Sequence, residues 1–208
     1  RQAAAAPDHP VGGAGDDQSD VRFGGHARDL PASAGNAKWN RMSGAQKLVE
    51  EVRRRFGERA ATTDPAEIGP WLTDWRGRVH GRSLAILAPA STGEVAAIVR
   101  LAGEHRVPLV PQGGNTSMVA GATPPADGSA LVLSLRRMNR LRSIGPGSAI
   151  AEAGMILADL HSAAAGTGQR FPLTLGARGS CTVGGLVATN AGGTQVLRFG
   201  TMRSLVLG

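Results

Sequence analysis

The segment of residues 111–121 contains the residue types that could bind a phosphate group. It begins Pro-Gln-Gly-Gly-Asn-Thr-Ser and follows an apolar run. Paired glycines such as Gly113 and Gly114 let a backbone approach a ligand closely. Successive N–H groups can then surround an anion, and Thr116 and Ser117 would add hydroxyl donors. The pattern favours a pyrophosphate-binding loop, and an ordinary glycine-rich turn is the alternative.

Two familiar phosphate-binding motifs are excluded for this segment. A P-loop requires a Gly-Lys-Ser/Thr sequence, and no lysine is present here. A Rossmann fingerprint requires its glycine turn to begin a long helix. The glycines here lead instead into Thr123, Pro124 and Pro125, which would end a helix early. The segment is therefore a phosphate-binding loop of another kind, or only a loop.

A second glycine-rich segment, residues 172–193, alternates glycine with Thr, Ser and Asn. Its glycine content argues against a plain helix or strand. Long irregular segments of compact domains are usually functional or disordered. Disorder is disfavoured by the apolar residues in the segment, namely Leu173, Leu175, Val183, Leu186 and Val187.

The titratable side chains do not form a recognisable catalytic or metal site. The five histidines are far apart in the sequence, and none lies near carboxylates at metal-ligand spacing. His161 falls on a predicted helix, which is more typical of a surface or hydrogen-bonded core residue than of a catalytic base. The single cysteine, Cys181, excludes a disulfide framework and is interpreted as a buried structural thiol. No catalytic residue is assigned, and no metal is expected.

Helices and strands that could position these segments are predicted on both sides of the first one. Ser43 and Gln46 form a capping box at the start of a helix that Gly57 ends, and Asp64-Pro65 marks a second helix start. Trp71 and Trp75 would lie one above the other if their segment is helical. Strands are predicted at residues 84–87, 107–110, 130–135, 149–153 and 204–207, and a helix at residues 156–165.

Between the first two strands, Ser91 and Glu94 form another capping box. The helix that follows is predicted to bury one apolar face, consisting of Val95, Ile98, Val99 and Ala102. Strand, helix and strand together indicate a βαβ-like unit, with the first glycine-rich segment directly after its second strand.

Composition limits the classes of function. The 208 residues suffice for one domain, and no apolar run approaches the length of a membrane span. The net charge of +7 raises the possibility of nucleic-acid binding, but aromatic residues make up 3% of the chain and tyrosine is absent. Residues 1–41 are rich in Ala, Gly and Asp and are predicted to be a disordered leader. Met42 is a hypothetical natural start.

Three stretches, residues 89–95, 110–117 and 171–208, resemble the FAD-binding domain of the vanillyl-alcohol oxidase and p-cresol methylhydroxylase (PCMH) superfamily. They are most similar to its FAD-linked D-2-hydroxyacid dehydrogenases. The resemblance covers about residues 63–208. It implies an α+β fold consisting of the first α/β subdomain and the start of the second, truncated at the C-terminus. The implied domains are the leader at 1–41, a helical segment at 42–80 and an incomplete PCMH-type FAD-binding domain at 81–208.

The resemblance also implies that the two glycine-rich segments meet at a shared cleft, and which residues contact FAD. In the first segment these are Pro111, Gln112, Gly113, Gly114, Asn115, Thr116, Ser117 and Gly121. In the second they are Leu173, Gly176, Ala177, Gly179, Ser180, Thr182, Gly185, Thr189, Asn190 and Gly193. Some relatives attach flavin through a histidine where this chain has Asn115, so non-covalent FAD is expected. Phe199 replaces a tyrosine common in relatives. A Gly114→Val substitution is expected to abolish FAD retention, with a smaller effect on folding.

The implied activity is oxidation of a small 2-hydroxy acid of the D-lactate, glycolate or D-2-hydroxyglutarate class to the 2-oxo acid, by hydride transfer to FAD. The electron acceptor is not implied. The substrate-binding residues and the base are expected beyond residue 208, so the chain alone is expected to be inactive. A cytoplasmic, bacterial protein is expected. The alternatives are a non-catalytic nucleotide- or anion-binding module and a basic interaction domain.

Overall fold

A four-stranded sheet organises the first half of the described chain. The computed structural model describes residues 34–208, with side chains from residue 44 onward. The strands are β1 (Ala61–Thr62), β2 (Ile86–Leu87), β3 (Leu109–Gln112) and β4 (Leu131–Ser134), in the order β1-β2-β4-β3. β4 pairs in parallel with both β2 and β3, while β1 is antiparallel to β2. The carboxyl ends of β2, β3 and β4 therefore lie at one edge of the sheet.

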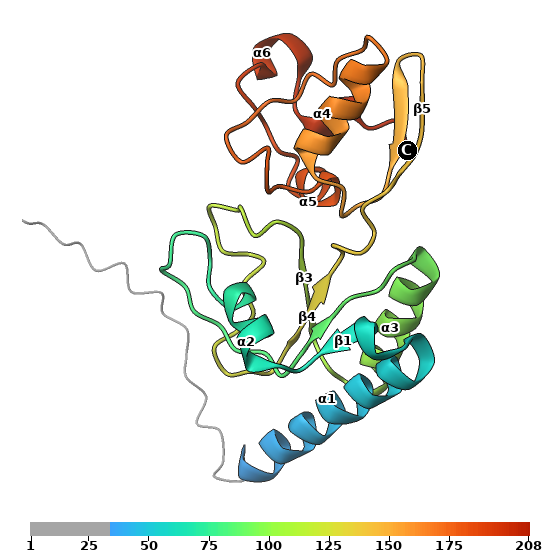
Figure 1. Ribbon diagram of the computed structural model, residues 1–208. Coiled ribbons are helices and arrows are strands. Elements are labelled where there is room, and N and C mark those ends of the chain that lie inside the picture. Colours follow the sequence, from blue (N-terminus) through green and yellow to red (C-terminus); the bar gives the residue numbers. More distant parts are fainter. Residues whose placement is uncertain (1–33) are drawn as a thin grey trace, which may run out of the picture. The chain divides into compact units, whose positions relative to one another are not determined.

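Helices cover both faces of this sheet (Figure 1). The helices α1 (Ala34–Phe56) and α3 (Thr92–Glu104) lie on one face, and α2 (Pro65–Ile68) lies on the other. Side chains alternate between the faces along each strand. One core contains Leu48, Val52, Leu87, Ile98, Leu101, Leu131 and Leu133, and the opposite core contains Ile68, Ile86 and Val132. Both faces of β2 and β4 are thereby buried.

The first helix differs from its prediction at one end and agrees at the other. It begins at Ala34, so Ser43 lies inside the helix and is not its cap. Residues 34–42 contain no proline and several good helix formers, which allows the helix to extend through them. Residues 34–41 of the predicted leader are therefore helical, and residues 1–33 lie outside the described residues. The predicted stop is confirmed, because Gly57 follows with φ of 85°.

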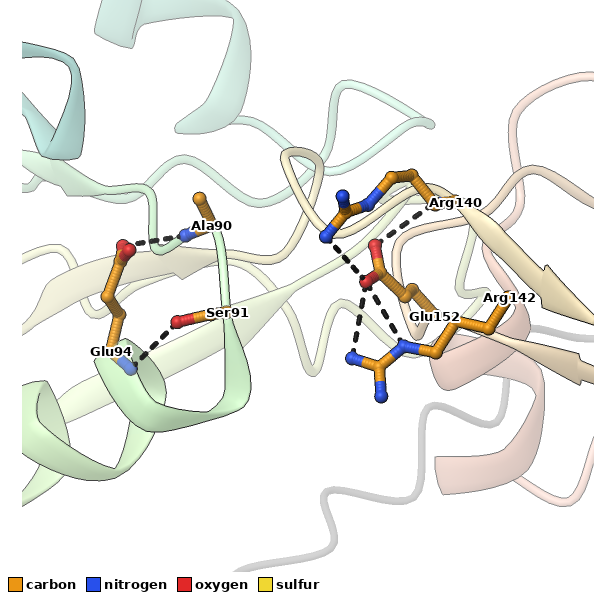
Figure 2. A network of polar contacts seen from close by, with 6 residues as sticks. All are labelled: Ala90, Ser91, Glu94, Arg140, Arg142 and Glu152. Atoms are coloured by element: carbon orange, nitrogen blue, oxygen red, sulfur yellow. Dashed lines mark hydrogen bonds and ion pairs between the residues drawn. The ribbon is translucent and has the colours of Figure 1, made fainter.

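The cap of α3 is formed as predicted, and its buried face is formed in part. Ser91 Oγ accepts the Glu94 N–H at 3.2 Å, and Glu94 Oε2 accepts the Ala90 N–H at 2.8 Å (Figure 2). Ile98 and Ala102 are buried as predicted, but Val99 is 50% exposed and Leu101 is buried instead. Positions i, i+3 and i+4 share a helix face, whereas i+1 is rotated about 100° away.

Other predicted elements need smaller corrections. The Asp64-Pro65 helix start is confirmed, because Asp64 accepts the Ala66 N–H. Trp71 ends a 3-10 turn (Gly69–Trp71) and Trp75 lies beyond it, so the two are not on one helix. β2 is shorter than predicted, and β3 starts two residues later. Val107 donates its N–H to the Ala102 carbonyl and so belongs to the end of α3.

The second half contains a hairpin and three helices. The hairpin pairs β5 (Leu141–Gly145) with β6 (Ser148–Ala151), and the helices are α4 (Leu157–Gly166), α5 (Val183–Ala188) and α6 (Val196–Phe199). α4 matches its prediction closely, and β5 was not predicted. α5 corrects the expectation that the second glycine-rich segment forms no helix. A further core, formed by Leu157, Leu173, Cys181, Leu186 and Met202, joins α4 and α5 to the second glycine-rich segment.

The predicted strand at residues 204–207 is wrong. A 3-10 turn (Met202–Leu205) occupies this position. Met202 is buried and donates its N–H to the Ala191 carbonyl, while Ser204 bonds locally to Thr201. These bonds use the backbone groups that a strand would need for pairing.

Glu152 fixes the base of the hairpin (Figure 2). Its side chain is 1% exposed, and Oε2 accepts the backbone N–H of Arg140 at 3.0 Å. Oε1 accepts from the guanidinium groups of Arg140 and Arg142 at 3.4 and 3.2 Å. These donors, the Arg140 N–H first, lower the pKa of Glu152 against the opposing effect of burial.

The described residues belong to one compact unit. Within this part of the chain, no helix is long and apolar enough to cross a membrane. Nor does any group of three or more His, Cys, Asp or Glu residues gather there in a way that could hold a metal ion.

Candidate functional site

The first glycine-rich segment begins where β3 ends. Gln112, the last residue of β3, is in register with Ser134, the last residue of β4. Gly113 and Arg136 follow these two positions, so they emerge at the same edge of the sheet. Ligands of open parallel sheets commonly bind at the carboxyl ends of the strands.

A pocket of about 350 Å³ lies at this edge. Its lining combines the predicted loop, a neighbouring segment and one residue that follows β4. The lining residues are Pro70, Trp71, Thr73, Asp74, Trp75, Gln112, Gly113, Gly114, Asn115 and Arg136. Residues 71–75 are hereafter called the wall segment.

The two glycine-rich segments meet beside this pocket. A Cβ atom on Gly114 would overlap the Ser180 carbonyl, and one on Gly113 would overlap Thr182 Oγ1. At Gly114 only glycine permits this approach, because main-chain atoms occupy the space that a side chain needs, whereas at Gly113 the Thr182 side chain occupies it. The two segments are therefore in contact, but no residue of the second segment lines the pocket itself.

Backbone hydrogen bonds attach the second segment to the start of α4. Leu157 donates its N–H to the Cys181 carbonyl at 3.1 Å, and Ala158 donates to the Arg178 carbonyl at 3.0 Å. Further along the segment, a Cβ on Gly193 would overlap the Thr174 carbonyl. The segment is thus folded upon itself and upon α4 through main-chain contacts.

Several backbone N–H groups in both segments remain available to a ligand. Among residues 34–208, none of the N–H groups from Gly114 to Met118 donates to a protein acceptor. Those of Gly176, Ala177 and Gly179 are likewise unpaired within the described chain. A series of free N–H groups on a loop is suited to binding an anion.

Asp74 stabilises the turn that continues from the wall segment. It is 5% exposed, and its carboxylate accepts the N–H groups of Arg78 and Val79 at 2.7 Å and that of Arg76 at 3.3 Å. These bonds, the one from Val79 first, lower the pKa of Asp74 although burial opposes them. The carboxylate is therefore charged at neutral pH and already engaged by backbone donors.

Arg136 is the cation that lines the pocket. Its guanidinium lies 4.0 Å from the centre of the Trp71 ring, in a cation–π arrangement. This contact positions a positive charge beside the free N–H groups of the loop. The combination favours an anionic ligand over a neutral one.

Many of the predicted ligand residues have side-chain partners within the protein. Asn115 donates to the Thr73 carbonyl, and Gln112 donates to the carbonyls of Trp71 and Ala122. Leu173 belongs to the core of the second half. Around α5, Thr182 accepts the Gly185 N–H, Thr189 donates to the Gly185 carbonyl, and Asn190 accepts the Arg203 N–H.

The remaining predicted residues do not line the pocket. Pro111 is exposed on β3. Thr116, Ser117 and Gly121 continue the loop beyond Asn115, and Gly121 has open space where a side chain would be. Gly176 and Gly179 have the same open space, which would let a ligand approach their backbone. Of the first segment, Gln112, Gly113, Gly114 and Asn115 line the pocket, and its later residues do not.

Each described histidine contacts a polar group of the protein, and the cysteine is buried. His80 Nδ1 lies 3.1 Å from Thr73 Oγ1, His105 Nε2 lies 3.4 Å from Glu51 Oε2, and His161 Nε2 lies 2.9 Å from the Leu173 carbonyl. The last contact agrees with the prediction that His161 is a hydrogen-bonded structural residue. Cys181 is buried as predicted, and burial raises its thiol pKa.

Sequence reasoning missed six residues of the pocket lining, namely Pro70, Trp71, Thr73, Asp74, Trp75 and Arg136. The first five lie 36 or more positions before the loop, and nothing in their spacing indicates that the chain returns to it. Asp74 could have been identified as a turn residue from the sequence, because aspartate often accepts backbone hydrogen bonds at the start of a turn that contains glycine. Arg136 could have been suspected only from its place directly after a predicted strand.

Comparison with known proteins places this site in a family. Residues 83–208 match the family described as "FAD binding domain". The chain is 45% identical over 148 residues to a mitochondrial D-2-hydroxyglutarate dehydrogenase of Bos taurus, covering 70% of this chain and 27% of the relative. A D-2-hydroxyglutarate dehydrogenase of Xanthomonas citri pv. viticola is 41% identical over 148 residues, with 70% and 31% covered. The chain thus spans about 30% of these relatives' length.

Solved structures show the same fold. An alkyldihydroxyacetonephosphate synthase superimposes with a TM-score of 0.68 at 23% identity, covering 75% of this chain and 31% of that chain. A p-cresol methylhydroxylase with substrate bound superimposes with a TM-score of 0.61 at 16% identity, covering 72% and 30%. The predicted α+β fold of PCMH type is confirmed.

Proposed function

Because this chain belongs to the FAD binding domain family, we propose that its two glycine-rich segments together bind the diphosphate of a non-covalently held FAD. The observation that carries the proposal is the meeting of Gly113 and Gly114 with residues 180–182 beside the pocket. The free N–H groups of residues 114–118 would surround the diphosphate, and Arg136 would supply a positive charge.

The residues present are suited to a dinucleotide in further ways. Gln112 is 2% exposed, and its Oε1 atom has no hydrogen-bond partner in the described chain. A buried acceptor without a partner is costly, and a hydroxyl or amino group of a ligand could satisfy it. Gly176 and Gly179 leave their main chain open to a ligand that continues along the second segment. The remaining residues predicted from the resemblance stay proposals for this path.

We further propose that the whole protein oxidises a small 2-hydroxy acid, as the names of its relatives indicate for them. Bound flavin supplies hydride acceptance in such reactions. The contribution of this chain would be to hold and orient the cofactor. None of the described histidines is placed as a base, so we assign no catalytic residue here. A cytoplasmic, bacterial protein stays a prediction.

A titration of the purified protein with FAD tests the proposed cofactor. We expect saturable quenching of flavin fluorescence with one FAD bound per chain. Binding of ADP that equals or exceeds that of FAD would instead favour the nucleotide-binding module. A folded protein that binds neither would contradict the proposal. Acid precipitation should release all flavin into the supernatant, and flavin retained on the protein would contradict non-covalent binding.

Dye reduction tests the proposed substrate class in the whole protein. D-2-hydroxyglutarate, D-lactate and glycolate should be compared at equal concentration, each with its mirror-image isomer where one exists. Reduction by at least one of the three, with preference for the D isomer, is expected. An FAD-loaded whole protein that reduces dye with none of them would refute the substrate class and leave the cofactor proposal standing.

A further inference from the structure

Two side-chain amides connect the two sides of the pocket. Gln112 Nε2 donates to the Trp71 carbonyl at 3.0 Å, and Asn115 Nδ2 donates to the Thr73 carbonyl at 2.7 Å. Both acceptors belong to the wall segment, and both donors belong to the first glycine-rich segment. The pairs are 41 and 42 positions apart in sequence, so these bonds hold together parts of the chain with no local connection.

The geometry at Asn115 restricts the residue that can form this bond. Its φ of 51° lies in the left-handed region, which asparagine tolerates better than most residues with a side chain. The position must also supply a donor to the Thr73 carbonyl. Glycine satisfies the first requirement only, and aspartate satisfies the second only when its carboxyl group is protonated.

The wall segment is itself a fixed structure. Thr73 and His80 form an antiparallel bridge, Asp74 donates its N–H to the Val79 carbonyl, and Gly81 donates to the Leu72 carbonyl. A bond from Asn115 to this turn therefore fixes the loop relative to a stable neighbour. Because the free N–H groups of residues 114–118 belong to this loop, the same bond would also fix the direction in which they point.

We propose that Asn115 is a positioning residue: with Gln112, it fixes the wall segment against the glycine-rich loop and so holds the loop's free N–H groups in place for the FAD diphosphate. The inference rests on the proposed function above. It gives the side chain of Asn115 a role different from direct contact with the cofactor, because its amide donates to the Thr73 carbonyl. Loss of the bond should loosen the wall segment even when no cofactor is bound.

Two substitutions at Asn115 separate these roles. Asn115→Gly keeps the left-handed backbone and removes the donor. Asn115→Asp keeps size and shape, but at neutral pH its carboxylate faces the Thr73 carbonyl without a proton to donate. An unfavourable partner raises a carboxyl pKa, so protonation should restore the bond as the pH falls towards about 5.

The first measurement uses the protein without FAD. Trp71 and Trp75 lie in the wall segment, so acrylamide quenching of their fluorescence measures how easily a small quencher reaches this segment. All variants carry Trp39→Phe, so that these two tryptophans supply the whole signal. We expect greater quenching for both variants at pH 7, and a return towards wild-type quenching at about pH 5 for Asn115→Asp only. Unchanged quenching in both variants would overturn the proposal.

The second measurement is FAD affinity. Both variants should bind about tenfold more weakly at pH 7, which corresponds to about 1.4 kcal/mol. Asn115→Asp should recover affinity at the lower pH, and Asn115→Gly should not. Wild-type affinity in Asn115→Gly would overturn the proposal. If the wild type binds no FAD, the proposed function fails, while the quenching experiment still decides whether Asn115 positions the wall segment.

Asn139→Asp is the matched control. Asn139 is exposed in the connection between β4 and β5, outside the pocket lining. It receives the same negative charge in the same half of the chain. Its quenching and FAD affinity should equal those of the wild type at both pH values. A pH-dependent loss equal to that of Asn115→Asp would show a general charge effect and overturn the positioning role.

Discussion

Gly114 is the position in the contact between the two glycine-rich segments where an added side chain would meet the other segment at the shortest distance. Its missing side chain leaves room for the Ser180 carbonyl, and a Cβ would also lie 3.0 Å from Cys181 Cα. The sequence predicted that Gly114→Val would lose FAD with a smaller effect on folding. The structure contradicts the second half of that expectation, because the substitution would separate the two segments even without a ligand.

We therefore predict that Gly114→Ala lowers the free energy of unfolding by about 1–3 kcal/mol, the usual cost of overpacking. Urea denaturation without FAD measures the change. Gly103→Ala is the control, since Gly103 lies in α3 with open space around its alpha carbon. That variant should be neutral or slightly stabilised. Equal stability of the two variants would show that the contact with Ser180 is not tight.

Asp74 should make the free energy of unfolding fall as the pH is lowered in the acid range. Its folded pKa is lowered by the N–H groups of Val79, Arg78 and Arg76. The carboxylate therefore contributes stability above the pKa of the unfolded chain, about 3.9. This contribution is lost as the pH falls through the lower folded value. Asp74→Asn should be less stable at neutral pH and show a shallower acid decline in urea midpoint than the wild type. Parallel declines would contradict the assignment.

At the scale of elements, the cap of α3 is the feature with the most direct local test. Ser91→Ala removes the acceptor for the Glu94 N–H and should cost about 1 kcal/mol. Thr92→Ala at the neighbouring exposed position should change stability by less than about 0.5 kcal/mol. Thermal unfolding of both variants compares them. A Ser91→Ala protein as stable as the wild type would show that Glu94 alone suffices at this helix end.

The sequence predicted elements well where local chemistry determines them. The Ser91–Glu94 cap, the Asp64-Pro65 start and the Gly57 stop are all present, because each needs only neighbouring residues. The failures occurred where apolar residues form turns instead of strands. Val107 donates to Ala102, five positions earlier, instead of starting β3, and Ser204, the first residue of the predicted last strand, donates to Thr201 within a 3-10 turn.

At the scale of the whole molecule, two cores are linked where the glycine-rich segments meet. Cys181 lies between Ser180 and Thr182, the residues that contact Gly114 and Gly113, and it is part of the second core. The contact between these segments was expected from the resemblance to the FAD-binding domain. The sequence could not predict the wall segment, because the bonds of Gln112 and Asn115 to it exist only once the sheet has formed.

The rate at which the Cys181 thiol is alkylated should depend on the contact between the two glycine-rich segments. Burial and a raised pKa both reduce thiolate availability, so alkylation of the native protein should be slow. FAD at about 100 times its dissociation constant would add about 2.7 kcal/mol of stability and slow alkylation further. Gly114→Ala should accelerate it. Mass spectrometry of the labelled peptide follows the reaction, and identical rates with and without FAD would contradict a shared site.

The contact between the glycine-rich segments joins the main chain of Gly113 and Gly114 to the main chain of residues 180–181 and the Thr182 side chain, and this has a consequence for protein engineering. Main-chain atoms are common to all relatives, whatever their side chains. An exchange of residues 136–208 for the corresponding stretch of a relative should therefore leave this junction intact, provided that both glycines and Thr182 are retained. We expect such hybrids to fold more often than those with crossover points inside either hydrophobic core, where side-chain shapes must match.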